Sequence, residues 1–495
     1  MCGILCLFGE DREVPVGLLT HRGPDDYRTK KLGRCRMDFY RLAINDLTVA
    51  GMQPFFKGKA MYVCNGEIYD HTRYVSGYEK SKSDCEVLGH LISHMGIKHT
   101  AEDINGDFAI VYSDGHRVLA ARDYVGVRPL FYTRYAPGSI AFGSEVKALT
   151  FLGSRVEIFP PGHFYDSYLD FFVCYHTGHW PHVSKSLSTS CDVRQALEQS
   201  VHVRLNNTER DVGFLLSGGL DSSLIASIAQ RKIGKINTFS IGLNGSPDLE
   251  AARKVAKFLG SNHHEVLFTV EQGLATLEEV IHSIESYDCT TVRASVPMWI
   301  LCKYIKQKTS CRYIFSGEGS DEVLGGYIYF KNAPSREHFS LETMRRLHLI
   351  HQFDGLRADR CAGAHGLDLI VPFLDKNFVS TCMQLCAKDK MKGMIEKNIL
   401  REAFVGYLPE EILWRTKDGM SDAVGSRWVE ALREHAKDFT VDKSITHNTP
   451  LTGEEMMYRK IFRERFHAMN DHLISEIWRP KWTTVTDPSA RLLIE

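Results

Sequence analysis

The spacing of apolar residues changes once along this chain, and this change constrains the fold more than any other feature. Up to about residue 165, apolar runs are short and meet Gly, Asn, Asp or Pro within about ten residues, as in AMYVCNGEIYD and GDFAIVYSDGHRVLAARD. From residue 192 onward, short apolar runs alternate with helix-length segments, as in INTFSIGL followed by PDLEAARKVAKFLG. The pattern predicts a β-rich first part with a few helices, and a second part with a parallel sheet covered by helices.

The length of the chain also indicates more than one domain. With 495 residues, of which 43% are hydrophobic, the chain is too long for one core and has enough apolar material for two or three. Between residues 165 and 191 a stretch rich in aromatics, Ser and Thr has no clear period, and we place the boundary there. The predicted domains are residues 2–180 and residues 192–480, and helical spacing beyond Val323 predicts a helical extension of the second domain.

Charge and cysteine content limit the partners and the compartment. The chain has 60 Lys and Arg against 61 Asp and Glu without a basic block, so we expect small-molecule partners and neither nucleic acid nor a charged surface. No apolar run approaches the roughly 18 residues of a membrane span, and the first residues are acidic where a signal peptide would be basic. The 13 cysteines lack CxxC or zinc-ligand spacing, which is typical of reduced thiols. These features predict a cytoplasmic protein.

The chain begins MCGILCLFGE, with a cysteine directly after the initiator methionine. Removal of Met1 would give Cys2 a free α-amino group, which titrates near ~7.7–8.0 and can take a proton at neutral pH. An N-terminal residue activated by its own amine is a known form of covalent catalysis. Taken alone, however, the position fits a chance cysteine on a disordered chain start better.

The stretch GFLLSGGLDSSLIASIAQRK has the features of a phosphate-binding loop. An apolar strand ends at Leu216, a Ser-Gly-Gly turn follows, and Asp221, Ser222 and Ser223 open a helix. Helix N-termini present unpaired N–H groups, and glycines let phosphate oxygens approach the backbone. The loop is not of the GxxxxGK[ST] type, because no lysine follows the glycines. An SGG turn alone is often only a tight turn, but the full SGGLDSS string indicates an anion-binding site.

SGGLDSS resembles the pyrophosphate loop of the adenine-nucleotide α-hydrolases, and the chain as a whole resembles the glutamine-dependent asparagine synthetases. Fourteen motifs occur in the family's order: MCGI, HRGPDD, RLAI, NGEIYD, GDFA, RDYVGVRPLFY, FGSEVKAL, SGGLDSS, FSIGLNGSPDL, SYDCTTVRAS, SGEGSDEVLGGY, VPFLD, LREAF and WRTKDGMSD. The resemblance implies a two-domain α/β protein. Its first domain would be an α+β four-layer N-terminal-nucleophile fold of the class II glutamine amidotransferases, and its second a parallel-sheet α/β pyrophosphate-loop synthetase fold with a helical extension.

In the first domain the resemblance implies a glutaminase site. Cys2 would attack the side-chain amide of glutamine with its own amine as the base, and the side chain of Asn65 and the N–H of Gly66 would bind the oxyanion. Without Cys2, the Asn-Gly pair would indicate a hairpin turn. The substrate pocket implied by the family consists of Arg41 for the carboxylate of glutamine, Asp84 for its ammonium, and Glu67, Leu42 and Ile44.

In the second domain the resemblance implies a site that activates aspartate with ATP. The pyrophosphate would lie on Ser217, Gly218, Gly219, Asp221 and Ser222, the adenosine against Leu215 and Ile241, and a second turn, Ser316 and Gly317, against the nucleotide. Asp221 and Asp321 are candidate Mg²⁺ ligands. Glu318 would act on the aspartyl-AMP intermediate and take a proton from ammonia. Thr291 and Arg293 would bind the aspartate carboxylate or the developing phosphate charge, and Lys417 would neutralise the departing pyrophosphate.

The implied reaction makes asparagine from aspartate, glutamine and ATP through β-aspartyl-AMP, with ammonia passed inside the protein, and relatives are commonly homodimers or homotetramers. The chain departs from the family at Tyr40, where many relatives have histidine, at Ile370, where arginine is common, and at Asp418, where glutamate is usual. A related amidotransferase acting on another carboxylic acid therefore stays an alternative. A regulatory relative without catalysis is disfavoured, since Cys2, Asn65, SGGLDSS and Glu318 are present.

Overall fold

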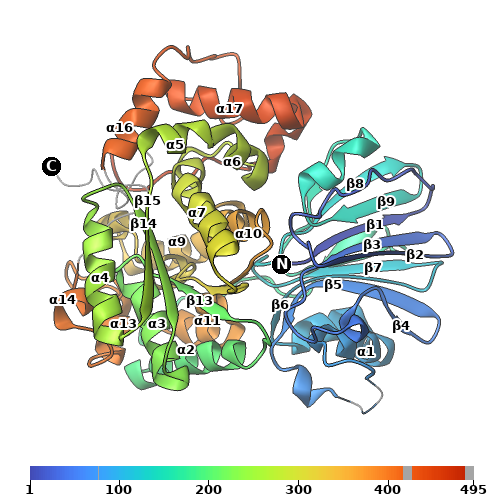
Figure 1. Ribbon diagram of the computed structural model, residues 1–495, viewed down its shortest axis with the longest axis horizontal. Helices are drawn as coiled ribbons and strands as arrows, with labels where there is room; N and C mark the ends of the chain where they lie inside the picture. The colour runs from blue at the N-terminus through green and yellow to red at the C-terminus, as the bar shows by residue number, and fades with distance from the viewer. Residues whose placement is uncertain (76, 78, 416–425, 485–495) are drawn as a thin grey trace.

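The computed structural model in Figure 1 describes residues 1–75, 77, 79–415 and 426–484. Its first part contains two six-stranded antiparallel sheets, and its second part contains one five-stranded parallel sheet among helices. Both predicted sheet types are therefore confirmed. Within the described ranges, no helix is long and apolar enough to cross a membrane.

The first sheet has the strand order β10-β8-β9-β1-β3-β2. Its strands are β1 (Gly3–Phe8), β2 (Asp26–Leu32), β3 (Cys35–Arg41), β8 (Phe131–Ala136), β9 (Ser139–Gly143) and β10 (Glu157–Ile158). The central strand β1 is buried on both faces: Ile4 and Phe8 pack between the two sheets, whereas Leu5 and Leu7 belong to a cluster shared with the second part. The strand that follows Cys2 is therefore fixed from both sides.

The second sheet has the order β12-β11-β7-β6-β5-β4. Its strands are β4 (Phe55–Lys57), β5 (Ala60–Ile68), β6 (Gly106–Ser113), β7 (Val118–Arg122), β11 (His163–Asp166) and β12 (Phe171–Cys174). Helix α1 (Val87–Asp103) packs on its outer face. The sheet extends past residue 165, where the apolar pattern of the sequence fades. The pattern fades there because β12 is an edge strand with half-exposed and exposed side chains.

The parallel sheet has the order β15-β14-β13-β16-β17. Its strands are β13 (Val212–Leu215), β14 (Asn237–Gly242), β15 (Asn262–Leu267), β16 (Tyr313–Phe315) and β17 (Asp368–Ile370). The helices that accompany this sheet up to residue 324 are α2 (Ser190–Leu205), α3 (Leu220–Ile233), α4 (Pro247–Leu259), α5 (Val270–Ala275), α6 (Leu277–Ile284), α7 (Cys289–Lys308) and α8 (Ser320–Leu324). The carboxyl ends of β13 and β16 lead directly into α3 and into the turn before α8, so both turns lie at one edge of the sheet.

The C-terminal region is mainly helical, as its sequence predicts. Its helices are α9 (Arg336–Leu349), α10 (Asp354–Gly363), α11 (Lys376–Met383), α12 (Ala387–Lys390), α13 (Asn398–Ala403), α14 (Glu410–Leu413), α16 (Ser426–His435) and α17 (Gly453–Phe466). Short 3-10 helices connect the elements of both parts: η1 (Val49–Gly51), η2 (His71–Arg73), η3 (Asp84–Glu86), η4 (Val146–Ala148), η5 (Thr150–Leu152), η6 (Ile328–Asn332), η7 (Ile350–Gln352), η8 (Pro372–Leu374) and η9 (Ala468–Leu473).

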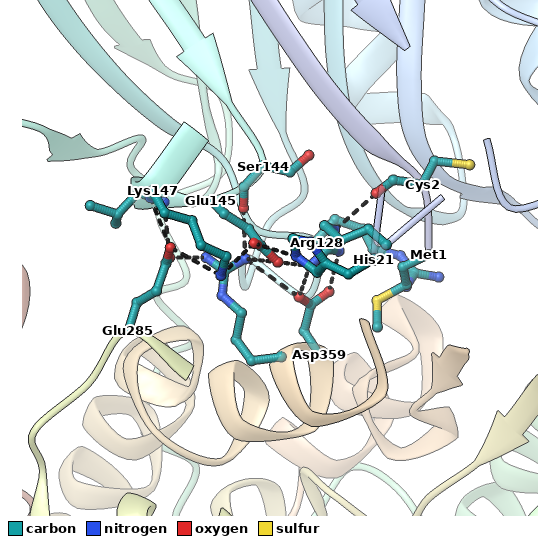
Figure 2. A network of polar contacts seen from close by, with 12 residues as sticks. Met1, Cys2, His21, Arg128, Ser144, Glu145, Lys147, Glu285 and Asp359 are labelled. Carbon is teal, nitrogen blue, oxygen red and sulfur yellow. Dashed lines mark hydrogen bonds and ion pairs between the residues drawn. The ribbon is translucent and has the colours of Figure 1, made fainter. Parts of the chain in front are cut away.

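Buried ion pairs join the two parts, and Figure 2 shows one network of them. Arg22 of the first part binds Asp359 of α10 at 2.7 Å, and Arg128 binds Asp368 of β17 at 2.7 Å. The N-terminal amine of Met1 donates to the backbone oxygen of Leu367 at 3.0 Å. The chain start is therefore held against the second part.

Candidate active sites

Cys2 lies directly before β1, in contact with the end of β3. Its Sγ is 3.4 Å from the backbone nitrogen of Leu42 and 3.5 Å from its oxygen. Burial raises the pKa of the thiol, so it needs a base to act as a nucleophile at neutral pH. Met1 precedes Cys2 in this chain and is 2% exposed, and burial lowers the pKa of its amine. Removal of Met1 stays a prediction.

Asn65 and Gly66 lie in the middle of β5 and not in a hairpin turn, so the turn interpretation of this pair is wrong. The side chain of Asn65 is fully buried, yet neither its Oδ1 nor its Nδ2 has a hydrogen-bond partner in the described part of the chain. A buried amide without partners is unfavourable by about 1–3 kcal/mol, and such groups gather at functional sites. A Cβ at Gly66 would lie 2.1 Å from the backbone oxygen of Asp107, so only glycine fits there.

Two buried carboxylates, Glu67 and Asp84, lie near each other at the end of β5. Asp84 accepts from the backbone N–H of Ile68 at 2.6 Å, and Glu67 accepts from the side-chain amides of Asn45 at 3.2 Å and Asn207 at 2.7 Å. Burial raises the pKa of Glu67, and the nearby Asp84 raises it further. Burial also raises the pKa of Asp84. A bound ammonium group would stabilise the ionised form of both side chains.

Arg41, at the end of β3, completes the first cluster. Its guanidinium donates to the backbone oxygens of Thr48, at 2.7 Å, and Asp46. The charge of Arg41 lowers the pKa of the Cys2 thiol and so opposes the effect of burial, and Leu42, whose backbone contacts the Cys2 Sγ, directly follows Arg41 in the chain. Leu42 and Ile44 are buried next to it. Asn207, which the sequence did not single out, comes from the segment after α2 in the second part.

The phosphate-type loop runs from the end of β13 to the start of α3. Gly218 has φ +74°, and a Cβ there would lie 2.4 Å from the backbone nitrogen of Ala252, so this position needs glycine. The hydroxyls of Ser217 and Ser222 are 3.0 Å apart. Gly219 is the N-cap of α3 and provides no side-chain cap, which leaves the first N–H groups of the helix available to an anion.

The second turn, Ser316 and Gly317, packs against this loop. A Cβ at Gly317 would lie 2.9 Å from the backbone nitrogen of Ser222, so the two turns are in close contact. Ser316 donates its backbone N–H to Ile370 at 2.9 Å. Leu215 is buried at the end of β13, and Ile241 is half-buried near the end of β14. The predicted nucleotide residues that are described therefore share one edge of the parallel sheet.

Asp221 and Asp321 both form ion pairs with Lys397, a residue that the sequence did not single out. The Nζ of Lys397 lies 2.6 Å from Asp221 Oδ2 and 2.7 Å from Asp321 Oδ1. Lys397 is 1% exposed and has φ +53°, a backbone conformation rare for a lysine. The described residues contain no cluster of three or more metal-type ligands, but two carboxylates and phosphate oxygens together suit Mg²⁺.

Glu318 is bound by α10. Arg357 donates from Nη2 to Glu318 Oε2 at 2.8 Å, and its Nη1 lies 2.6 Å from Asp354. This arginine is a second residue that the sequence analysis missed. It lies in the segment LRADR, which gives no local signal that its partner is 39 residues away.

Thr291 and Arg293 have protein partners in this structure. Thr291 donates its N–H and hydroxyl to Asp288 at the start of α7, at 2.9 and 2.7 Å. Arg293 makes a bidentate contact with Glu454 of α17, at 2.7 and 2.6 Å. Their role as substrate ligands stays a prediction. Lys417 and Asp418 lie outside the described residues.

The sandwich with a cysteine before its first strand places the chain among the glutamine amidotransferases, and residues 1–163 match the glutamine amidotransferase domain family. Residues 192–345 and 331–490 match the asparagine synthase family. The chain is 40% identical to the glutamine-hydrolyzing asparagine synthetase of Gallus gallus, over 100% of this chain and 98% of that protein. The chain is also 39% identical to the glutamine-hydrolyzing asparagine synthetase 1 of Lotus japonicus, over 99% of this chain and 93% of that protein. It is 40% identical to the glutamine-hydrolyzing asparagine synthetase of Homo sapiens, over 100% of this chain and 98% of that protein. This chain belongs to the family of glutamine-hydrolysing asparagine synthetases.

Proposed function

We propose that this chain makes asparagine from aspartate, glutamine and ATP, and releases glutamate, AMP and pyrophosphate. The observation that carries the proposal is the pairing of two sites in one molecule. One site has Cys2 before β1 and, on β5, the buried amide of Asn65, which has no hydrogen-bond partner among the described residues; the other has the glycine turn of Gly218 and, after it, two carboxylates bound to Lys397. Membership of the family supports the substrates.

In the first half-reaction, Cys2 attacks the side-chain carbonyl of glutamine after Met1 has been removed. The thiol proton goes to the new α-amine, the C–N bond breaks, ammonia leaves, and water then hydrolyses the thioester. Asn65 and the N–H of Gly66 stabilise the oxyanion. The fork of Arg41 binds the carboxylate of glutamine, and Asp84, with Glu67, binds its ammonium.

In the second half-reaction, the side-chain carboxylate of aspartate attacks the α-phosphate of ATP and gives β-aspartyl-AMP and pyrophosphate. The Ser217–Ser222 loop and α3 hold the departing pyrophosphate, and Lys417 neutralises it. Ammonia from the first site then displaces AMP. Glu318, held by Arg357, takes the proton that the attacking ammonia loses.

Mg²⁺ is proposed as the metal of this site, where it would neutralise charge on the pyrophosphate. Asp221 and Asp321 would hold it. Lys397 contacts one oxygen of each carboxylate, and the hydroxyl of Ser320 donates to Asp221 Oδ1 at 2.8 Å. A cytoplasmic location, a homodimer or homotetramer, internal passage of ammonia, and domain limits at residues 2–180 and 192–480 complete the proposal.

The test is pyrophosphate release by the purified protein with ATP and Mg²⁺, with glutamine and then ammonia as the nitrogen source. Aspartate-dependent release with both sources, and asparagine as the product, would support the proposal. If pyrophosphate is released only with another acid, that acid and not aspartate is the acceptor. No release with any acid would leave a non-catalytic regulatory relative.

One observation favours the alternative that the acceptor is a carboxylic acid other than aspartate. The side chain of Ile370 is fully buried on β17, which pairs with β16 directly before the Ser316 turn. An apolar side chain here, where the family resemblance leads us to expect arginine, removes a charge near the acceptor. A panel of amino acids that differ in side-chain length and charge therefore belongs in the same assay.

A further inference from the structure

Helix α10 contacts both candidate sites with neighbouring residues. Arg357 and Asp359 are two positions apart, which places them about 200° apart around the helix. Arg357 binds Glu318 at 2.8 Å. Asp359 accepts from both terminal nitrogens of Arg22, at 2.7 and 3.1 Å. One short helix of the second part thus supports a residue in each site.

Arg22 extends this contact to the nucleophile. Its Nε donates to the backbone oxygen of Cys2 at 3.0 Å, and its Nη1 donates to Glu145 at 2.9 Å. The side chain is fully buried, and Asp359 and Glu145 keep its pKa above the ordinary value although burial lowers it. The guanidinium therefore stays charged and is fixed on three sides. Figure 2 shows Asp359 reaching from its helix toward the region of Cys2 and Glu145.

The packing of α10 leaves little room for Arg22 to move. Gly363 lies one turn after Asp359, and a Cβ there would be 2.9 Å from Arg22 Nη1. On the same helix, Arg360 donates to the backbone oxygen of Ser144 at 2.9 Å and to Glu285 at 2.8 Å, and neither of these contacts includes Arg22. The position of the Cys2 backbone is therefore set by an element of the second part.

We propose that Asp359 is a positioning residue of the glutaminase site, which acts through Arg22 on the backbone of Cys2. The glutaminase site is then incomplete without α10. The inference rests on the proposed function, since it assumes that Cys2 attacks glutamine. A nucleophile displaced by about 1 Å can lose on the order of 100-fold in rate, so a change at Asp359 acts on kcat more than on KM.

The test compares glutamine hydrolysis and ammonia-dependent synthesis in the full-length protein and in Asp359→Asn. We expect the variant to lose about 10-fold or more in kcat for glutamine hydrolysis, with KM for glutamine and ammonia-dependent synthesis within about twofold. The matched control is Glu285→Gln, which removes a buried carboxylate from the same interface without touching Arg22. It is expected to keep kcat for glutamine hydrolysis within about twofold.

Two outcomes would overturn the inference. Either Asp359→Asn leaves kcat unchanged, or Glu285→Gln lowers it as much, in which case the interface as a whole is responsible. If Asp359→Asn does not fold, Gly363→Ala decides, because it pushes against Arg22 and changes no charge, and alanine is favourable in a helix. Wild-type protein without any glutaminase activity would contradict the proposed function instead.

Discussion

The two candidate sites differ in how their carboxylates are compensated. In the first, Glu67 and Asp84 accept hydrogen bonds from neutral amide groups, and both have raised pKa values. In the second, Asp221, Asp321 and Glu318 lie on the cations of Lys397 and Arg357. The first pocket is therefore suited to a ligand that brings its own positive charge, as an amino acid does. In the second site the protein's own cations already compensate the carboxylates.

The largest expected effect is a loss of the glutamine-dependent activities with the ammonia-dependent activity kept. Cys2→Ala removes the nucleophile, so glutamine hydrolysis and glutamine-dependent synthesis should fall by about 1000-fold or more. Ammonia-dependent synthesis should stay within about twofold, because the second site has its own residues. Glutamate release and asparagine formation measure the two activities in one sample. Equal loss of both would mean that the sites do not work separately.

Asn65→Ala sharpens the description of the first site. Loss of one oxyanion donor should lower kcat for glutamine hydrolysis by about 100- to 1000-fold. Because the amide has no partner in the described structure, its removal should leave the melting temperature unchanged or raised, although it is fully buried. Asn207→Ala is the control: it removes a hydrogen bond to Glu67 and should lower the melting temperature. A large loss of stability in Asn65→Ala would contradict the role of a poised donor.

Lys397→Met tests the second site. Without the ammonium, Asp221 and Asp321 lose the buried cation that they share, so we expect a loss of about 3–5 kcal/mol in stability and about 100-fold in ammonia-dependent synthesis. Glutamine hydrolysis should change by less than about threefold. Pyrophosphate release and thermal unfolding give the two readouts. Normal synthesis in this variant would show that the site does not need this cation.

The smallest expected effect is a pH dependence of the first site. Asp84 has a raised pKa in the folded protein, so its contribution to stability is present below its unfolded pKa of roughly 4 and is lost as the pH rises through its folded pKa. Asp84→Asn should therefore stabilise the protein at neutral pH and flatten this dependence. It should also raise KM for glutamine. Thermal unfolding between roughly pH 5 and 8 checks this, and identical profiles would contradict it.

Much of the fold and of both sites could be predicted because short motifs fix local geometry. Gly218 and Gly66 lie where a Cβ would meet backbone atoms, and both are in quoted motifs. Lys397, Arg357 and Asn207 were missed because each acts on a residue more than 30 positions away, and only tertiary packing chooses that partner. No local pattern around these residues distinguishes them from solvated side chains.

The burial of Met1 has a consequence for the order of events during synthesis. Its amine is bonded to Leu367, in the second part, and the side chain is 2% exposed. A processing peptidase needs the first residue in its own active site, so the proposed removal of Met1 requires that the peptidase act before the chain start packs against Leu367. Maturation of the proposed nucleophile would then compete with folding, and a chain that folds with its methionine in place would keep Cys2 without a free amine.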